Sequence, residues 1–191
     1  QEMKRLSERV GARILIKRED TTGLAFGGNK IRNHEFIFGD ILDRGCDAVI
    51  TTAGVQSNMC RATAAAASKL GLKCVLLLRG SGEEARQGNL MLDELLGADV
   101  RFIPTQDPYD DRVPVWLDEV KAELVGKGLR PYVLHLTGET SMLATCAYVS
   151  GASELSQQLE TLGVDPAWLF VTAGSGITAA GLTLGLKHLG R

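Results

Sequence analysis

Residues 48–78 read AVITTAGVQSNMCRATAAAASKLGLKCVLLL, and this stretch decides the fold class. It begins with an apolar run at 48–52, passes through a polar turn into an alanine-rich segment at 57–70, and ends with a second apolar run at 74–78. Gly71 follows the alanine-rich segment directly, as a helix-ending glycine does. Two strand-length apolar runs around a helix-length segment are typical of a β-α-β unit, whose strands are parallel.

The same alternation continues on both sides of this stretch. Further strands are expected at 100–103, 132–136 and 169–172. Further helices are expected at 30–44, 83–96, 113–127, 141–162 and 178–189. Repeated β-α-β units with apolar strands predict an α/β fold, in which a parallel twisted sheet carries helices on both faces.

Composition excludes several classes of function. The chain has 191 residues, 45% of them hydrophobic, and a net charge of −2, with no basic patch that would indicate nucleic-acid binding. No apolar run is long enough to cross a membrane, and the polar residues 1–4 contain no signal-peptide core, so we expect a soluble cytoplasmic protein. The four cysteines are widely spaced and form no Cys-x-x-Cys pair, so no metal site is expected.

Lys30 lies in the segment Phe26-Gly27-Gly28-Asn29-Lys30, at the expected start of a helix. The two glycines allow the backbone to approach a ligand closely, because they have no Cβ. A lysine amine that is buried at a helix start can lose its proton and form a Schiff base with a carbonyl group, including that of pyridoxal phosphate. The alternative is an ordinary lysine in the first turn of an α/β helix.

Two polar turns follow expected strands, where ligands of parallel α/β sheets bind. The first contains Gln56, Ser57 and Asn58, which suit a polar planar ligand or a substrate carboxylate; the alternative is that Ser57 or Asn58 simply caps the helix. The second turn, residues 173–178, offers several backbone N–H groups to a phosphate. It is not a Walker A loop, since no Gly-Lys-Ser/Thr follows, and a tight structural turn is its alternative.

Four motifs occur in one order along the chain. They are Gly27-Gly28-Asn29-Lys30-x-Arg32, Gln56-Ser57-Asn58-x-x-Arg61, Gly88-Asn89-Leu90-x-Leu92-Asp93-x-Leu95-Leu96-Gly97-Ala98 and Thr172-Ala173-Gly174-Ser175-Gly176-x-Thr178-x-Ala180-Gly181. With these motifs the chain resembles the pyridoxal-phosphate-dependent D-cysteine desulfhydrase and 1-aminocyclopropane-1-carboxylate deaminase family. That family has the tryptophan-synthase-β-like fold, also called fold type II of the pyridoxal-phosphate enzymes. The likeness extends from Arg13 to Gly190.

The resemblance implies a role for each motif. Lys30 would bind the cofactor pyridoxal 5'-phosphate covalently and later move protons at the substrate α-carbon. Asn58 would hydrogen-bond the phenolic oxygen of the cofactor. Ser57 would act in catalysis beside the substrate carboxylate, within a substrate-binding turn formed by Gln56, Ser57 and Asn58. The residues implied to hold the cofactor phosphate are Ala173, Gly174, Ser175, Gly176, Ile177 and Thr178.

The resemblance also implies how the chain is organised. Residues 36–144 would form a smaller α/β domain, and residues 1–35 with 145–191 would form part of a larger, cofactor-binding domain. Family members continue well beyond the helix that ends near Arg191, so the expected large domain is incomplete. Open sheet edges and uncovered apolar faces invite pairing with another copy, so a homo-oligomer is expected.

A few positions depart from the family pattern. Asn33 stands where a second lysine often assists phosphate binding. Ile177 stands where a second glycine is frequent, and its β-branched side chain resists positive φ, so a less accommodating loop is expected. Cys60 lies beside the polar turn, where we expect it to pack on a helix face.

Three functions are compatible with these residues. The first is a pyridoxal-phosphate-dependent lyase or deaminase acting on a small amino acid, with D-cysteine desulfhydrase-like α,β-elimination ahead of 1-aminocyclopropane-1-carboxylate deaminase-like ring opening. The second is a truncated, catalytically inactive protein that binds the cofactor. The third is an interaction protein that keeps only the scaffold. Intact Lys30, Ser57 and Asn58 argue against the third, because no structural need requires all three.

Overall fold

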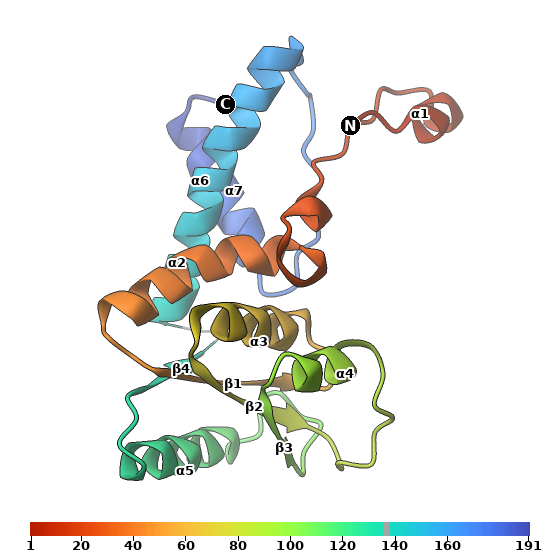
Figure 1. Cartoon of the computed structure of the whole chain (residues 1–191). Helices are drawn as coiled ribbons and strands as arrows, with labels where there is room; N and C mark the ends of the chain where they lie inside the picture. The colour runs from red at the N-terminus through yellow and green to blue at the C-terminus, as the bar shows by residue number, and fades with distance from the viewer. Residues whose placement is uncertain (136–137) are drawn as a thin grey trace.

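A four-stranded parallel sheet forms the lower layer of the computed structural model, which describes residues 1–135 and 138–191 (Figure 1). The strand order is β3-β2-β1-β4. The strands are β1 (Ala48–Gly54), β2 (Lys73–Arg79), β3 (Asp99–Ile103) and β4 (Pro131–Leu134). Ala48 of β1 lies opposite Lys73 of β2 and Pro131 of β4, and all three pairings are parallel. The predicted parallel sheet is thereby confirmed.

Helices cover both faces of this sheet, as the apolar strands predict (Figure 1). On one face lie α3 (Asn58–Leu70) and α4 (Gly88–Leu95), and on the other lies α5 (Val113–Gly126). Two apolar clusters match these layers. Cys60 and Leu76 belong to the cluster beneath α3 and α4, whereas Ile50 and Leu124 belong to the cluster against α5.

Three further helices build the upper part of the molecule. α2 (Asn29–Asp43) lies across α3, and α6 (Glu139–Leu162) pairs with α7 (Ile177–His188) above it (Figure 1). Gly181 and Gly185 of α7 bring the last two helices close together. A Cβ on Gly181 would come within 2.5 Å of the Thr145 carbonyl oxygen, and one on Gly185 within 2.5 Å of Ala152 Cβ. This close packing holds α7 against α6.

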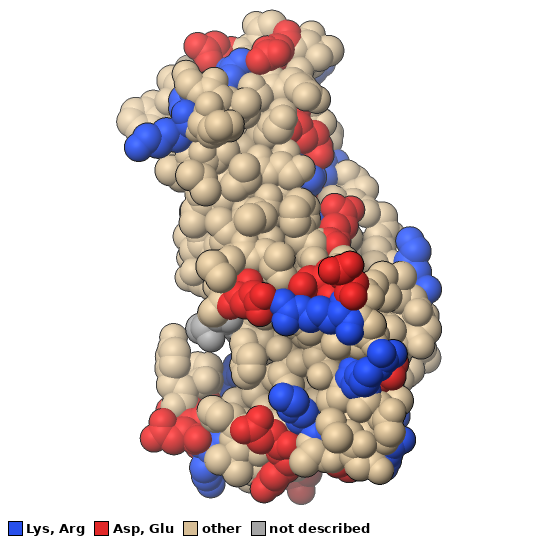
Figure 2. Space-filling view, turned by 90° about the vertical axis from the view of Figure 1, so that its left-hand side faces the viewer, with Lys and Arg blue, Asp and Glu red and all other residues tan. Residues whose placement is uncertain are grey.

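The remaining segments lie at the periphery. α1 (Lys4–Val10), which the apolar pattern does not predict, lies away from the sheet, and two short 3-10 turns, η1 (Glu19–Thr21) and η2 (Leu24–Phe26), lead into α2. Figure 2 shows uncharged side chains over much of the upper surface, where α6 and α7 pair, and more charged side chains lower down, around the sheet layer. None of the helices in the described ranges has the length and apolar character needed to span a bilayer.

Two expected elements differ from the structure. Residues 169–172 form no strand, because a strand needs a partner and none of the described strands pairs with this segment; Phe170 is 90% exposed. The helix expected at 83–96 begins only at Gly88, since the Glu84 carboxylate accepts hydrogen bonds from the backbone N–H groups of Ser81 and Gly82 and holds a turn there. Leu136, the expected end of the fourth strand, lies outside the described residues.

Candidate functional site

A cavity of about 500 Å³ lies where the start of α2, the middle of α6 and the loop before α7 meet. Lys30 and Asn29 line it from α2, and Tyr148 lines it from α6. The opposite wall contains five of the six residues predicted to hold a phosphate: Gly174, Ser175, Gly176, Ile177 and Thr178. Ala173, the sixth, is not among the lining residues. The fold therefore brings together two motifs that are far apart in the sequence.

Lys30 is the second residue of α2 and is partly buried. Burial lowers the pKa of its amine, because the charged form loses solvation. The preceding turn holds it in place. Gly27 has φ +66°, and a Cβ there would lie 2.4 Å from the Asp20 carbonyl oxygen, so only glycine fits this position. Gly28 N–H donates to the Glu19 carbonyl oxygen at 2.8 Å, which anchors the turn.

Within the described part of the chain, the loop before α7 presents backbone N–H groups that have no partner. Gly176 occupies the N-cap position with φ +81°, and in the described structure no side chain caps this helix. The first N–H groups of a helix have no intrahelical partners and lie at the positive end of its dipole, so they favour an anion. Asn29 Nδ2 donates to Thr178 Oγ1 at 3.2 Å, and this bond joins the loop directly to the residue before Lys30.

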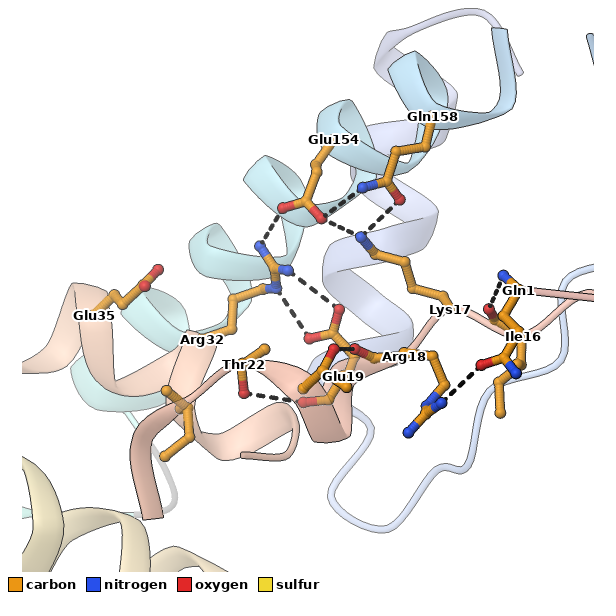
Figure 3. Close-up of a pocket in the computed structure, with 12 residues that line it drawn as sticks. Gln1, Ile16, Lys17, Arg18, Glu19, Thr22, Arg32, Glu35, Glu154 and Gln158 are labelled. Atoms are coloured by element: carbon orange, nitrogen blue, oxygen red, sulfur yellow. Dashed lines mark hydrogen bonds and ion pairs between the residues drawn. The ribbon is translucent and has the colours of Figure 1, made fainter. Parts of the chain in front are cut away.

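A cluster of ion pairs joins the segments that surround the cavity (Figure 3). Arg32, one helical turn into α2, donates two hydrogen bonds of 3.1 Å to the Glu19 carboxylate and one of 3.0 Å to Glu154 on α6. Tyr148 Oη donates to Glu19 at 3.0 Å, and burial raises its pKa, so this phenol stays protonated. Lys17 also pairs with Glu154. The cluster ties the N-terminal segment, α2 and α6 together around Lys30.

His34 fixes the backbone of Lys30 from the other side of α2. Its Nδ1 lies 2.7 Å from the Lys30 carbonyl oxygen, and its Nε2 lies 2.8 Å from Thr63 Oγ1 on α3. Burial lowers the pKa of His34 to about 4, so the ring is neutral at pH 7. A carbonyl oxygen only accepts hydrogen bonds, which places the single ring proton on Nδ1. His34 therefore links the Lys30 helix to the helix that follows the polar turn.

The polar turn itself does not line this cavity. Ser57 caps α3, since its Oγ accepts hydrogen bonds from Met59 N–H at 3.1 Å and Cys60 N–H at 3.3 Å. This is the capping role that the sequence left open. Gln56 Oε1 accepts from Asn89 N–H at 2.8 Å and thereby joins the turn to α4.

The positions that depart from the family pattern have structural explanations. Ile177 is the first residue of α7 and has no positive φ, so the expected strain in the loop is absent and that expectation was wrong. Asn33 is buried and is not a lining residue of the cavity. Cys60 is buried as expected, and burial raises the pKa of its thiol to about 12.

Several lining residues lack a local sequence signal. Tyr148 reaches the cavity through the packing of α6 against α2, and Glu19, on η1, is held there by its hydrogen bonds with Arg32 and Tyr148. Leu169 and Phe170 line it from the segment expected to be a strand. Asn29 is the exception, because it belongs to the glycine motif and could have been singled out beside Lys30.

Comparison with known proteins places this geometry in context. The whole chain, residues 1–191, matches the family described as "Pyridoxal-phosphate dependent enzyme". It is 43% identical to a Pyrococcus abyssi protein that carries a provisional name as a 1-aminocyclopropane-1-carboxylate deaminase, over 97% of this chain and 54% of the relative. It is 41% identical to a D-cysteine desulfhydrase of Klebsiella pneumoniae, over 97% of this chain and 56% of the relative. The chain thus spans about half the length of these curated relatives.

Solved structures agree with the sequence relatives. The crystal structure of an ACC deaminase homologue superposes with a TM-score of 0.85 at 39% identity, covering 100% of this chain and 56% of the other. Escherichia coli diaminopropionate ammonia lyase in its apo form gives a TM-score of 0.77 at 21% identity, covering 100% of this chain and 54% of that one. The second likeness concerns the fold alone, and both confirm the predicted tryptophan-synthase-β-like architecture.

Proposed function

The chain belongs to the pyridoxal-phosphate-dependent enzyme family, and from this premise we propose that it takes part in a lyase or deaminase reaction on a small amino acid. D-cysteine desulfhydrase-like α,β-elimination is the first candidate reaction, and 1-aminocyclopropane-1-carboxylate deaminase-like ring opening is the alternative. One observation carries the proposal: the hydrogen bond between Asn29 and Thr178 joins the Lys30 turn and the α7 loop across a single cavity.

The residues that line the cavity fit pyridoxal phosphate. One end holds a lysine amine whose pKa burial lowers, and a neutral amine is the form that reacts with an aldehyde. The other end holds the uncapped start of α7, whose N–H groups favour a phosphate. A volume of about 500 Å³ is in the usual range for small-molecule sites.

Each group of the chain would have a separate task in the reaction. When bound, the cofactor supplies an electron sink for the substrate α-carbon. Lys30 Nζ holds the cofactor and, when released, takes or returns a proton at Nζ. The N–H groups at the start of α7 bind and orient the phosphate. We assign to Ser57 the substrate carboxylate and to Asn58 the phenolic oxygen of the cofactor. The polar turn does not itself line the cavity, but Arg61 joins Asn58 to the Gly27 carbonyl oxygen, three residues before Lys30.

Turnover assays distinguish the candidate reactions. The chain is incubated with pyridoxal phosphate and either D-cysteine or 1-aminocyclopropane-1-carboxylate, and sulfide and ammonia are measured. Elimination from D-cysteine releases both products, whereas ring opening of the cyclopropane amino acid releases ammonia without sulfide. Lys30→Ala should abolish either activity, and the matched control Lys69→Ala, at an exposed position on α3, should retain it.

A failure of turnover would separate the two other candidate functions, an inactive cofactor-binding protein and a scaffold. Binding of the cofactor at Lys30 without any turnover would favour the catalytically inactive cofactor-binding protein. Lack of both binding and turnover would contradict the proposal and favour a scaffold that has kept only the fold.

We further propose that copies of the chain associate. The support is the exposure of large apolar side chains on α7 and in the segment before it, including Trp168, Phe170 and Leu184. Light scattering at micromolar concentration tests this proposal. A mass above that of one chain is expected, and a monomer would contradict it.

A further inference from the structure

Arg61 lies at the centre of a hydrogen-bond network that connects three of the four sequence motifs. Its Nη1 donates to Asn58 Oδ1 at 3.1 Å and to Asn89 Oδ1 at 3.0 Å. Its Nη2 donates to the Gly27 carbonyl oxygen at 3.2 Å. One guanidinium therefore joins the glycine turn before Lys30, the polar turn before α3 and the start of α4.

This network determines which way the Asn58 amide points. Asn89 Nδ2 also donates to Asn58 Oδ1, at 3.0 Å. Because donors from Arg61 and Asn89 converge on the same atom, that atom must be the carbonyl oxygen of the amide and not its nitrogen. Asn58 Nδ2 then keeps both of its hydrogens available, since no acceptor in the described part of the chain takes them and the side chain is exposed.

An arginine suits this position better than a lysine. The planar guanidinium presents several N–H donors in a fixed fork, so Arg61 can hold two amide oxygens and a carbonyl oxygen in defined directions. A lysine amine would keep the charge but would not fix three acceptors in one plane. Gly27 is three residues before Lys30, so the same guanidinium also sets where Asn58 lies relative to that lysine.

We propose that Arg61 is a positioning residue: it orients Asn58 so that the amide NH2 group donates to the anionic phenolic oxygen of pyridoxal phosphate. Arg61 acts through Asn58 and need not touch the ligand. This role rests on the proposed function, because it requires that the cofactor binds at Lys30.

The test compares two ligands that differ only at the phenolic oxygen. The full chain is titrated with pyridoxal phosphate or with 3-deoxypyridoxal phosphate, the bound ligand is trapped on Lys30 with borohydride, and the adduct is quantified by peptide mass spectrometry. Arg61→Lys should weaken the binding of pyridoxal phosphate about tenfold and that of the deoxy analogue less than about twofold. Asn58→Ala should show the same selective loss, and the double variant should lose no more than Asn58→Ala alone. Lys69→Ala, which removes a charge from the same helix, should match the wild type.

A second variant guards against misfolding of Arg61→Lys. Asn89→Asp removes the other donor to Asn58 Oδ1 while keeping an acceptor for Arg61, and it should also reduce the preference for pyridoxal phosphate. The proposal is overturned if the variants keep the wild-type ratio of the two affinities, or if both ligands weaken equally, since the role would then be purely structural. If the wild-type chain binds neither ligand at Lys30, the proposed function itself fails, and the role of Arg61 fails with it.

Discussion

Asn29 Nδ2 donates a 3.2 Å hydrogen bond to Thr178 Oγ1, although the two residues are 149 positions apart in the sequence. Asn29 precedes Lys30 directly, and Thr178 belongs to the first turn of α7. This bond therefore links the turn that carries the lysine amine directly to a helix start that favours phosphate. It joins the two ends of the proposed cofactor site.

The Gly27 turn should tolerate no side chain. Gly27→Ala places a Cβ 2.4 Å from the Asp20 carbonyl oxygen at φ +66°, and we expect it to lower the free energy of unfolding by at least about 2 kcal/mol. Gly39→Ala is the matched control, because it lies within α2 with open space around it and should gain about 0.5–1 kcal/mol. Urea denaturation measures the stability of both variants. Equal stability would contradict the conclusion that only glycine fits at position 27.

Two glycines of the α7 loop should differ in their effect on phosphate binding. Gly176→Ala forces a side chain into φ +81°, whereas Gly174 has open space and no positive φ. We expect Gly176→Ala to weaken the binding of pyridoxal phosphate about tenfold and Gly174→Ala to weaken it less than about threefold. Pyridoxal without its phosphate should not discriminate between the variants. If it does, or if both variants behave alike with the phosphate ester, the α7 loop does not bind the phosphate.

His34 should make stability depend on pH below 6.5. In the folded chain its pKa lies at about 4, whereas the unfolded value is 6.5, so the unfolded state binds a proton first as the pH falls. The wild type should therefore lose up to about 1.4 kcal/mol per pH unit from this residue between pH 6.5 and 4. The His34→Gln variant has no such titrating group. The difference in free energy of unfolding between it and the wild type at pH 7 should therefore shrink toward pH 4. The exposed His188→Gln serves as a control, and a constant deficit would show that His34 titrates normally.

Asp93 should make the folded chain less stable as the pH rises, which is the opposite of the effect of His34. It is completely buried on α4, its carboxylate has no hydrogen-bond partner in the described structure, and burial raises its pKa to about 7. Between pH 3.8 and 7 the unfolded state loses this proton first, so stability falls as the pH rises. Asp93→Asn should therefore gain stability over the wild type across this range and keep a constant gain above it. Urea denaturation at pH 4, 6 and 8 measures the gain, with the exposed Asp118→Asn as control; a gain that does not grow with pH would contradict the raised pKa.

The sheet could be predicted from the sequence because its strands are short apolar runs between polar turns. β1 and β2 each extend at most two residues beyond the expected limits. The segment 169–172 has the same apolar character, but none of the described strands lies beside it, and strand formation depends on that non-local partner. The start of α4 was missed for a local reason, since the Glu84 carboxylate binds the backbone of the preceding turn.

The sequence predicted those parts of the candidate site that a single local motif is enough to identify. Lys30 and residues 174–178 could be identified because glycine spacing and helix starts are local signals. Glu19 and Tyr148 carry no such signal, because their places depend on how η1, α2 and α6 pack together. The capping role of Ser57 could be recognised only from the coordinates, because a serine before a helix is as suitable for capping as for binding a ligand.

Covalent trapping shows whether Lys30 and the start of α7 form one cofactor site, as we propose. Pyridoxal phosphate is added to the full chain, the mixture is reduced with borohydride, and the modified peptides are identified by mass spectrometry. We predict one equivalent of adduct on Lys30, with Lys17 and Lys69 unmodified. Adducts spread over many surface lysines, or none on Lys30, would contradict the claim.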